Sequence, residues 1–168
     1  MTKFRFTIII INLLLISQLL YADKVSFVYL KITPSAREQA MGSCGVISAL
    51  GPQAMYYNPA LTSQITKTAL NINYYRWFLD IYGQSLFVVR PFNYLNLGFG
   101  VVNFNAGTLE LRPDHPTQEI LGEFNPSDFN LYFNISHQIK TSKIPLRIGI
   151  SLRYYYSKIY DATASGYG

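Results

Sequence analysis

The sequence predicts an all-β protein: an antiparallel transmembrane β-barrel, incomplete at about five strands, with an N-terminal lumenal plug of short helices. Three observations predict this class. Apolar and polar residues alternate with a period of two in most segments after residue 68. These segments are long, about ten residues, whereas strands of globular proteins usually have about five or six. The one long connection falls where an extracellular loop is expected.

Residues 1–22 have the layout of a secretory signal peptide. Lys3 and Arg5 provide a basic start, an apolar run extends over residues 6–20, and Ala22 is suitable for cleavage. The run is shorter than the roughly 20 apolar residues of a transmembrane helix, although an uncleaved anchor is the alternative. We therefore expect export. Together with the strand pattern, this predicts the outer membrane of a Gram-negative-type bacterium.

Composition argues against an ordinary soluble domain and against a nucleic-acid partner. Charged residues make up 14% of the 168 residues, against about 25% in a typical soluble domain. The net charge of +5 includes two basic residues of the signal peptide, and no basic cluster is present. The single cysteine, Cys44, excludes an intrachain disulfide. We expect its side chain to be a buried small residue.

Residues 23–67 are predicted to form the plug, or hatch, ahead of the first strand. Ser35 followed by Glu38 has the spacing of a helix capping box. Asn58 and Pro59 are typical of a helix start, with asparagine as the cap and proline at the first helical position. Such a short segment does not fold alone, and the lumen of the barrel is the place for it to pack.

Residues 68–168 are predicted to form the N-terminal part of the barrel. The five expected strands cover residues 69–75, 81–90, 94–104, 128–139 and 146–156. Strands of this length reach about 33 Å, and a tilt of about 40° makes them span an apolar band of roughly 25 Å. A soluble β-sandwich is the alternative. Its solvent face would carry Lys, Glu and Thr, whereas the polar face here carries mainly Asn, Ser, Gly and Gln.

Connection lengths also fit a barrel. If the first strand begins at the periplasm, residues 105–127 form an extracellular loop and residues 91–93 and 140–145 form periplasmic turns, which are short in such barrels. Five strands do not close a barrel, because barrels begin at about eight strands. We therefore expect the chain to be the N-terminal part of a longer protein, with a barrel assembled from several short chains as the alternative.

The segment FVYLKITPSAREQAMGSCGVISALGPQAMYYNPALTSQ, residues 27–64, resembles the N-terminal signature of the PorV/PorQ family of outer-membrane proteins. That family is related to the FadL-like long-chain fatty-acid transporters. The hatch motif that carries the resemblance consists of Ala36, Arg37, Met41, Gly42, Gly45, Asn58, Pro59 and Ala60.

The resemblance implies a barrel plugged by its N-terminal segment. It further implies passage of hydrophobic compounds across the outer membrane or, as the alternative, a role in a type IX-like secretion system that binds exported proteins. The implied partners are outer-membrane lipid, together with hydrophobic small molecules or secreted proteins.

Polar residues on the predicted lumen face are candidates for lining the lumen: Asp128, Asn130, Asn134, Arg147 and Arg153. The two arginines are expected either to stay solvated or to pair with Asp128. Ser136 and His137 point to opposite faces of a strand, so they cannot act as nucleophile and base. The sequence therefore predicts no catalytic residue, no metal site and no cofactor, and a membrane-embedded enzyme is the last of the three functional alternatives.

Overall fold

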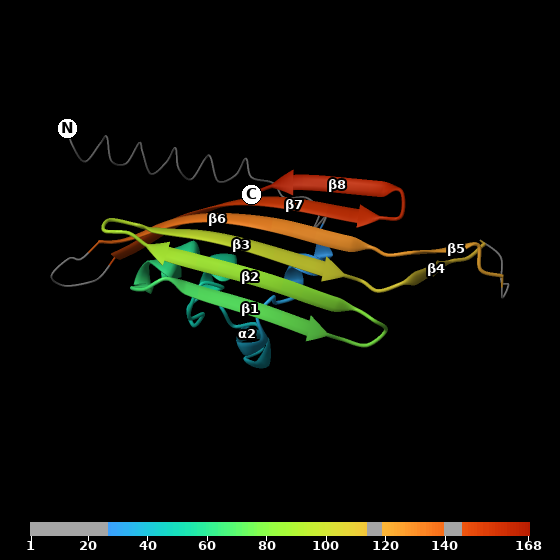
Figure 1. Cartoon of the computed structure of the whole chain (residues 1–168), viewed down its shortest axis with the longest axis horizontal. Coiled ribbons are helices and arrows are strands. Elements are labelled where there is room, and N and C mark those ends of the chain that lie inside the picture. Colours follow the sequence, from blue (N-terminus) through green and yellow to red (C-terminus); the bar gives the residue numbers. More distant parts are fainter. Residues whose placement is uncertain (1–26, 114–118, 140–145) are drawn as a thin grey trace, which may run out of the picture.

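The computed structural model describes residues 27–113, 119–139 and 146–168, shown in Figure 1. The predicted signal peptide, residues 1–22, lies outside the described residues. Four short helical elements come first: η1 (Val28–Lys31), α2 (Ala36–Ala40), α3 (Ala54–Tyr57) and η2 (Pro59–Gln64). We define residues 27–67, which contain these four elements, as the plug segment.

The rest of the described chain is antiparallel β-structure. Six strands form one sheet in the order β1-β2-β3-β6-β7-β8, and β4 pairs with β5 in a separate hairpin. The strands are β1 (Ala69–Arg76), β2 (Tyr82–Pro91), β3 (Asn96–Asn105), β4 (Leu109–Leu111), β5 (Gly122–Phe124), β6 (Ser127–Ile139), β7 (Leu146–Ile159) and β8 (Ala162–Tyr167). The expectation of an all-β, antiparallel fold is confirmed. The sheet is not closed, because β1 and β8 each have one unpaired edge within the described part of the chain.

Each predicted strand is present, with ends that differ by a few residues. Two predictions were incomplete. The expected loop 105–127 contains the β4–β5 hairpin, whose strands have only three residues each. Residues 162–167 form the strand β8, although their sequence, ATASGY, lacks a clear alternation. Their backbone pairs with the last six residues of β7, from Tyr154 to Ile159.

The connections separate to the two ends of the sheet (Figure 1). The turn between β1 and β2, the β4–β5 hairpin and the turn between β7 and β8 extend from one end, which we define as the loop end. The turn between β2 and β3 lies at the opposite end, defined as the turn end. The expected connection 140–145 lies outside the described residues.

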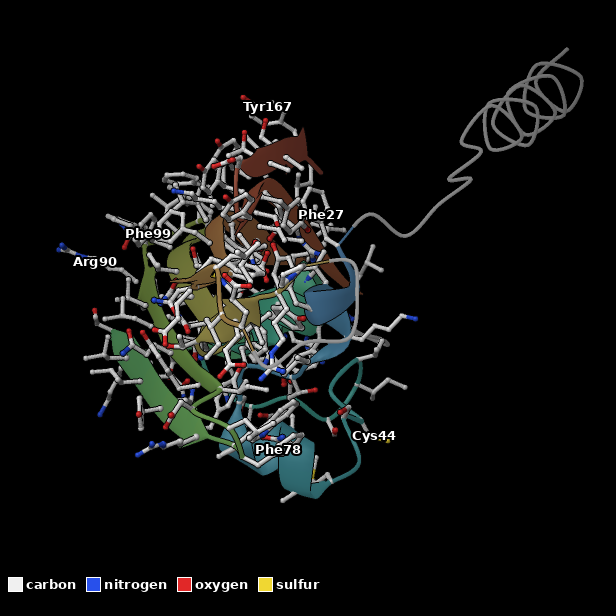
Figure 2. The ribbon with its side chains drawn as sticks, turned by 90° about the vertical axis from the view of Figure 1, so that its right-hand side faces the viewer. Phe27, Cys44, Phe78, Arg90, Phe99 and Tyr167 are labelled. Carbon is white, nitrogen blue, oxygen red and sulfur yellow. The ribbon has the colours of Figure 1, made fainter. Side chains whose placement is uncertain are left out.

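The plug segment covers one face of the sheet (Figure 2). The hydrophobic core lies between them and consists of Met55 from α3 with Phe87, Val89, Val102 and Tyr132 from three strands. All five side chains are buried. Because the core joins α3 to β2, β3 and β6, the plug segment and the sheet form one packed unit.

Candidate functional site

The two faces of the sheet differ in exposure and in chemistry. We define the side that the plug segment covers as the plug face and the other side as the outer face. The outer face exposes large apolar side chains, among them Leu70, Ile72, Leu97, Phe133, Ile135, Ile150 and Leu152. The plug face buries both the core residues Phe87, Val89, Val102 and Tyr132 and polar side chains, which include Ser85, Asn96, Asn130, Asn134 and Ser136. An antiparallel sheet in a water-soluble domain usually turns its polar face to water, whereas here the exposed face is the mainly apolar one.

Glycines on the plug face allow the plug segment to approach the backbone of the sheet. A Cβ atom at Gly149 of β7 would lie 2.5 Å from the backbone nitrogen of Ala60 and 2.5 Å from the carbonyl carbon of Pro59. At Gly98 of β3, a Cβ atom would lie 2.7 Å from the terminal methyl carbon of Met55. Any side chain at these positions would collide with the docked segment, so η2 and α3 pack where they do because these residues are glycines.

Thr62 of η2 is at the centre of a buried hydrogen-bond network. Its hydroxyl donates to the Pro59 carbonyl at 2.8 Å. Since the single proton is then used, the same oxygen accepts from the Asn134 amide at 2.6 Å and from the Ser136 hydroxyl at 2.7 Å. The Thr62 side chain is fully buried, and polar groups buried in this way must be paired to be tolerated.

Further polar groups of the sheet extend this network. The Ser151 hydroxyl of β7 donates to the Asn134 side-chain oxygen at 2.9 Å. The Asn96 amide of β3 donates to the Thr62 carbonyl at 2.7 Å and to the Ile65 carbonyl at 2.8 Å. Side chains of β3 and β6 therefore hold the last turn of the plug segment directly, and Ser151 of β7 supports it by orienting Asn134.

Asn58 and Pro59 begin the helix η2, as the sequence predicted. Asn58 caps η2, since its side-chain oxygen accepts from the Ala60 backbone nitrogen at 3.1 Å, and Pro59 occupies the first helical position. The Asn58 amide also donates to the Val46 carbonyl at 3.1 Å. This asparagine therefore ties the loop that precedes α3 to the start of η2, and η2 leads directly to β1.

The predicted capping box at α2 is wrong in its geometry. Ser35 is the N-cap residue, but its side chain makes no hydrogen bond to the backbone of α2. The hydroxyl instead donates to the side chain of Glu38. Glu38 is fully buried, and its other carboxylate oxygen accepts from the Arg37 guanidinium at 3.1 Å, which also donates to the Ser48 carbonyl at 3.1 Å. A buried carboxylate is costly unless it is hydrogen-bonded, so the Ser35 hydroxyl bonds to Glu38 and does not cap the helix.

The remaining hatch-motif residues shape the chain around α2. Ala36 is the first residue of α2, and Met41 is its C-cap. Gly42 follows with a φ of +69°, a left-handed conformation that favours glycine after a helix. A Cβ atom at Gly45 would lie 2.5 Å from the Tyr57 ring, so the absent side chain makes room for that ring.

The candidate lumen-lining residues all belong to β6 or β7, but their surroundings differ. Asn130 and Asn134 are buried beneath the plug segment, and the Asn130 side-chain oxygen accepts from the Tyr29 hydroxyl. Asp128 is intermediate in exposure, and Arg147 is exposed. The expected pairing of Asp128 with Arg147 or Arg153 is absent, since none of the ion pairs among the described residues includes Asp128.

Arg153 binds the plug segment instead of a carboxylate. Its guanidinium donates to the Tyr56 carbonyl at 3.3 Å and is 3.5 Å from the Met55 carbonyl. It also lies over the Tyr132 ring, 5.7 Å from the ring centroid. The two carbonyls belong to α3, so Arg153 places a positive charge against the C-terminal end of this one-turn helix.

Tyrosines of the plug segment are shifted toward their neutral form. Burial raises the pKa of Tyr57 to about 12. Burial also raises the pKa of Tyr56 and that of Tyr29, and neighbouring tyrosines add to both shifts. The Tyr56 hydroxyl donates to the Leu30 carbonyl, which links α3 to η1. The neutral phenol of Tyr29 donates to the sheet at Asn130, whereas that of Tyr56 joins two elements of the plug segment.

A cavity of about 270 Å³ lies at the turn end, where η2 leads into the first strand. Its lining joins Ser63 and Ile65 of the plug segment to Phe92 and Tyr94 of the β2–β3 turn and to Gln138 of β6. The lining mixes polar and apolar groups. Grooves with a mainly apolar lining lie instead on the outer face, and one runs between β6 and β7 along Ile135, Ile148 and Ile150.

Cys44 is exposed, so the expectation of a buried small residue is wrong. It lies in the loop after α2, on the side of the plug segment away from the sheet (Figure 2). His137 is on the outer face, where its Nδ1 is hydrogen-bonded to the Tyr94 carbonyl. The described residues contain no group of three or more potential metal ligands. They also contain no helix that is long and apolar enough to cross a membrane.

Sequence reasoning missed several residues that hold the plug segment in place. Thr62, Met55, Asn96 and Gly98 were not singled out as contacts of the plug segment. The period-two pattern did place Asn96 and Gly98 on the polar face. No local signal distinguishes Thr62 from its neighbour Ser63, because its partner Ser136 is 74 positions away.

Comparisons of the chain with protein-family models, with curated proteins and with solved structures gave no match.

Proposed function

We propose that the six-stranded sheet is part of the wall of an outer-membrane β-barrel of PorV/PorQ type and that the plug segment occupies its lumen. We further propose that the protein passes hydrophobic compounds across the membrane. The observation that carries the proposal is the chemistry of the two faces of the sheet. Its exposed face is mainly apolar, and most of its polar side chains are buried, together with a small hydrophobic core, beneath a segment rich in small residues.

The apolar outer face is long enough, along its strands, to span the apolar layer of an outer membrane. On β7 the outer face carries Leu146, Ile148, Ile150, Leu152, Tyr154 and Tyr156. Ten residues of strand measure about 33 Å, and a tilt of about 40° gives a band of roughly 25 Å, the height of the apolar band of outer-membrane barrels. Exposed aromatic residues at the two ends, such as Phe78 and Tyr94, match the aromatic girdles of these barrels.

Closure requires further strands, because an unpaired backbone group in lipid costs several kcal/mol. The free edges of β1 and β8 are where the remaining wall would pair. The wall would then surround the plug segment, including the side that faces away from the present strands. Val46, Ile47 and Leu50 are exposed on the plug segment. Passage of a hydrophobic compound between these residues and the remaining wall is the route that we propose.

Uptake of radiolabelled oleate by cells that depend on the full-length protein tests transport. Ile47→Asp puts a charge on the proposed route, and Asn58→Ala loosens the junction of the plug segment. We expect both variants to change uptake, while Lys158→Gln, at the loop end of the outer face, leaves it unchanged. Unchanged uptake in both variants at normal membrane levels would refute transport. Co-purification with exported proteins in that case would support the secretion alternative.

Heat-modifiable migration of the full-length protein on gels tests the barrel itself, because closed barrels resist unfolding in detergent until they are heated. Identical migration before and after heating, together with extraction from membranes at alkaline pH, would refute the membrane-spanning sheet.

A further inference from the structure

We propose that the outer face carries a binding site for an anionic phospholipid at the turn end, with Arg90 as the headgroup ligand. This inference rests on the proposed function, since it places the outer face in a bilayer. The outer face would then select an anionic phospholipid from the other lipids of the bilayer, through Arg90 and the apolar side chains beside it.

Arg90 is the only charged residue on the outer face at the turn end of the described strands. It is exposed, and it takes part in none of the ion pairs among the described residues. Its guanidinium lies over the Phe92 ring, 5.3 Å from the centroid. That contact fixes the side chain near the end of β2 and leaves the guanidinium hydrogen atoms available to a ligand.

An apolar groove of about 350 Å³ adjoins this arginine. Its side chains come from β2, β3 and β6 and include Val88, Leu97, Phe133 and Ile135. Cross-strand register explains the groove: Arg90, Leu97 and Ile135 form one row across the outer face. Val88, Phe99 and Phe133 form the next row toward the loop end, with the two phenylalanine rings edge to face at 5.2 Å.

Figure 2 shows that Arg90 and Phe99 both extend from the side of the sheet opposite the plug segment. A ligand that occupies the groove and also contacts Arg90 must combine an apolar chain with a negatively charged end. In a bilayer, an anionic phospholipid meets both requirements, because its acyl chain lies along the strands and its phosphate lies at the interface. A guanidinium can bind phosphate oxygens through two parallel hydrogen bonds.

The charges of the two ends favour the same orientation. Except for Glu38 in the plug segment, the described acidic residues lie at the loop end: Asp80, Glu110, Glu119, Glu123, Asp128 and Asp161. The described part of the turn end carries Lys67, Arg90 and Arg147 without an acidic residue. The loop end also holds Arg76, Arg112 and Lys158, but its acidic residues outnumber them. An anionic headgroup is therefore attracted to the turn end and repelled by the loop end.

Arg76 provides a matched control, because it is also an exposed arginine on the outer face but lies at the loop end. Arg76 differs from Arg90 in having a partner, since its guanidinium pairs with the carboxylate of Asp80. Replacement of either arginine by glutamine removes one charge from the same face of the same hairpin. Only the loss at Arg90 removes the proposed phosphate ligand.

The test is native mass spectrometry of the full-length protein in mixed micelles that contain phosphatidylglycerol or phosphatidylcholine. We expect the wild type to retain phosphatidylglycerol about 5- to 10-fold better than phosphatidylcholine. Arg90→Gln should abolish this preference, and Arg76→Gln should keep it. Equal preference in Arg90→Gln and the wild type would overturn the site. Glycerol phosphate that competes as well as the intact lipid would overturn the role of the groove.

A second measurement does not depend on a stable variant. Phosphatidylglycerol with a photoreactive group in its acyl chain should attach within residues 88–99 or 131–135 of the wild type. Attachment confined to other parts of the chain, or to a second copy, would overturn the site. Heat-modifiable migration of the same samples distinguishes failure of the lipid site from failure of the proposed barrel. A protein that migrates as a barrel but lacks lipid preference refutes only the lipid site.

Discussion

Replacement of Gly149 by alanine tests whether the plug segment is held at the distance that the structure gives. The added Cβ atom would lie 2.5 Å from the Ala60 nitrogen and 2.7 Å from the Pro59 oxygen. Both are backbone atoms, which cannot rotate away as a side chain can. Relief of the overlap therefore requires η2 and β7 to separate by about 1 Å, given ordinary carbon contacts of about 3.5–4 Å.

Overpacking of this kind costs about 1–3 kcal/mol. Separation also stretches the hydrogen bonds between Thr62 and the strand residues Asn134 and Ser136, so the upper part of that range applies. If the cost falls on docking, a cost of about 2–3 kcal/mol shifts the equilibrium for opening of the plug segment by about 30- to 150-fold. Hydrogen exchange of the backbone amides of residues 60–66, followed by mass spectrometry of the full-length protein in detergent, measures this shift directly.

Two other glycines serve as matched controls. A Cβ atom at Gly98 would meet the flexible end of Met55 at 2.7 Å, so Gly98→Ala should have a smaller effect because the methionine can change rotamer. A Cβ atom at Gly122 of β5 would meet nothing within 4 Å, so Gly122→Ala should leave exchange unchanged. If Gly149→Ala exchanges no faster than Gly122→Ala, the close approach of η2 to β7 is wrong.

Three further predictions concern single side chains. Thr62→Val keeps the shape of the side chain but leaves the Asn134 amide without its partner, so the free energy of unfolding should fall by about 1–3 kcal/mol in a urea titration; a change below about 0.5 kcal/mol would contradict the network. Since burial raises the pKa of Tyr57 to about 12, above the ordinary 10.0, its contribution to stability is fully present below pH 10 and is lost as the pH rises toward 12. The thermal midpoint should therefore fall over that interval less steeply in Tyr57→Phe than in the wild type, and parallel curves would contradict the shift. Leu79→Gly should raise the thermal midpoint, because Leu79 has a φ of +53° in the β1–β2 turn and a non-glycine residue there costs about 1 kcal/mol; Leu79→Ala, which keeps the strain, should not raise it.

The period of two identified five strands because alternation is a local property of the sequence. Each residue of β6 between Asp128 and Ile139 takes the face that its position predicts, and the chemistry of both faces follows. Strands that are very short, or that consist of small residues, were not predicted, because they show no clear alternation. β4 and β5 have three residues each, which is too few to show a period, and β8 consists of alanine, threonine, serine and glycine apart from its last residue, Tyr167.

The plug segment could be recognised as a unit, but its contacts could not be predicted, because they join residues far apart in the chain. The Ser35–Glu38 spacing matched a capping box, yet the Glu38 carboxylate is buried in the fold and uses the hydroxyl for itself. Cys44 was expected to be buried on the basis of residue type alone, and it lies on the side of the plug segment that the sheet does not cover. In both cases tertiary position decided the outcome.

The glycines of the sheet show what the sequence and the structure each explain. The sequence places Gly98 and Gly149 on the polar face, where a residue without a side chain has no evident purpose. The structure supplies the purpose, because Met55 and Pro59 occupy the space that side chains would fill. A sheet that must let a covering segment approach closely, and still present a continuous apolar surface on its other side, needs small residues on one face only. The alternation of β3, with Gly98 and Gly100 facing the plug segment and Leu97, Phe99 and Val101 facing outward, meets that requirement within five residues.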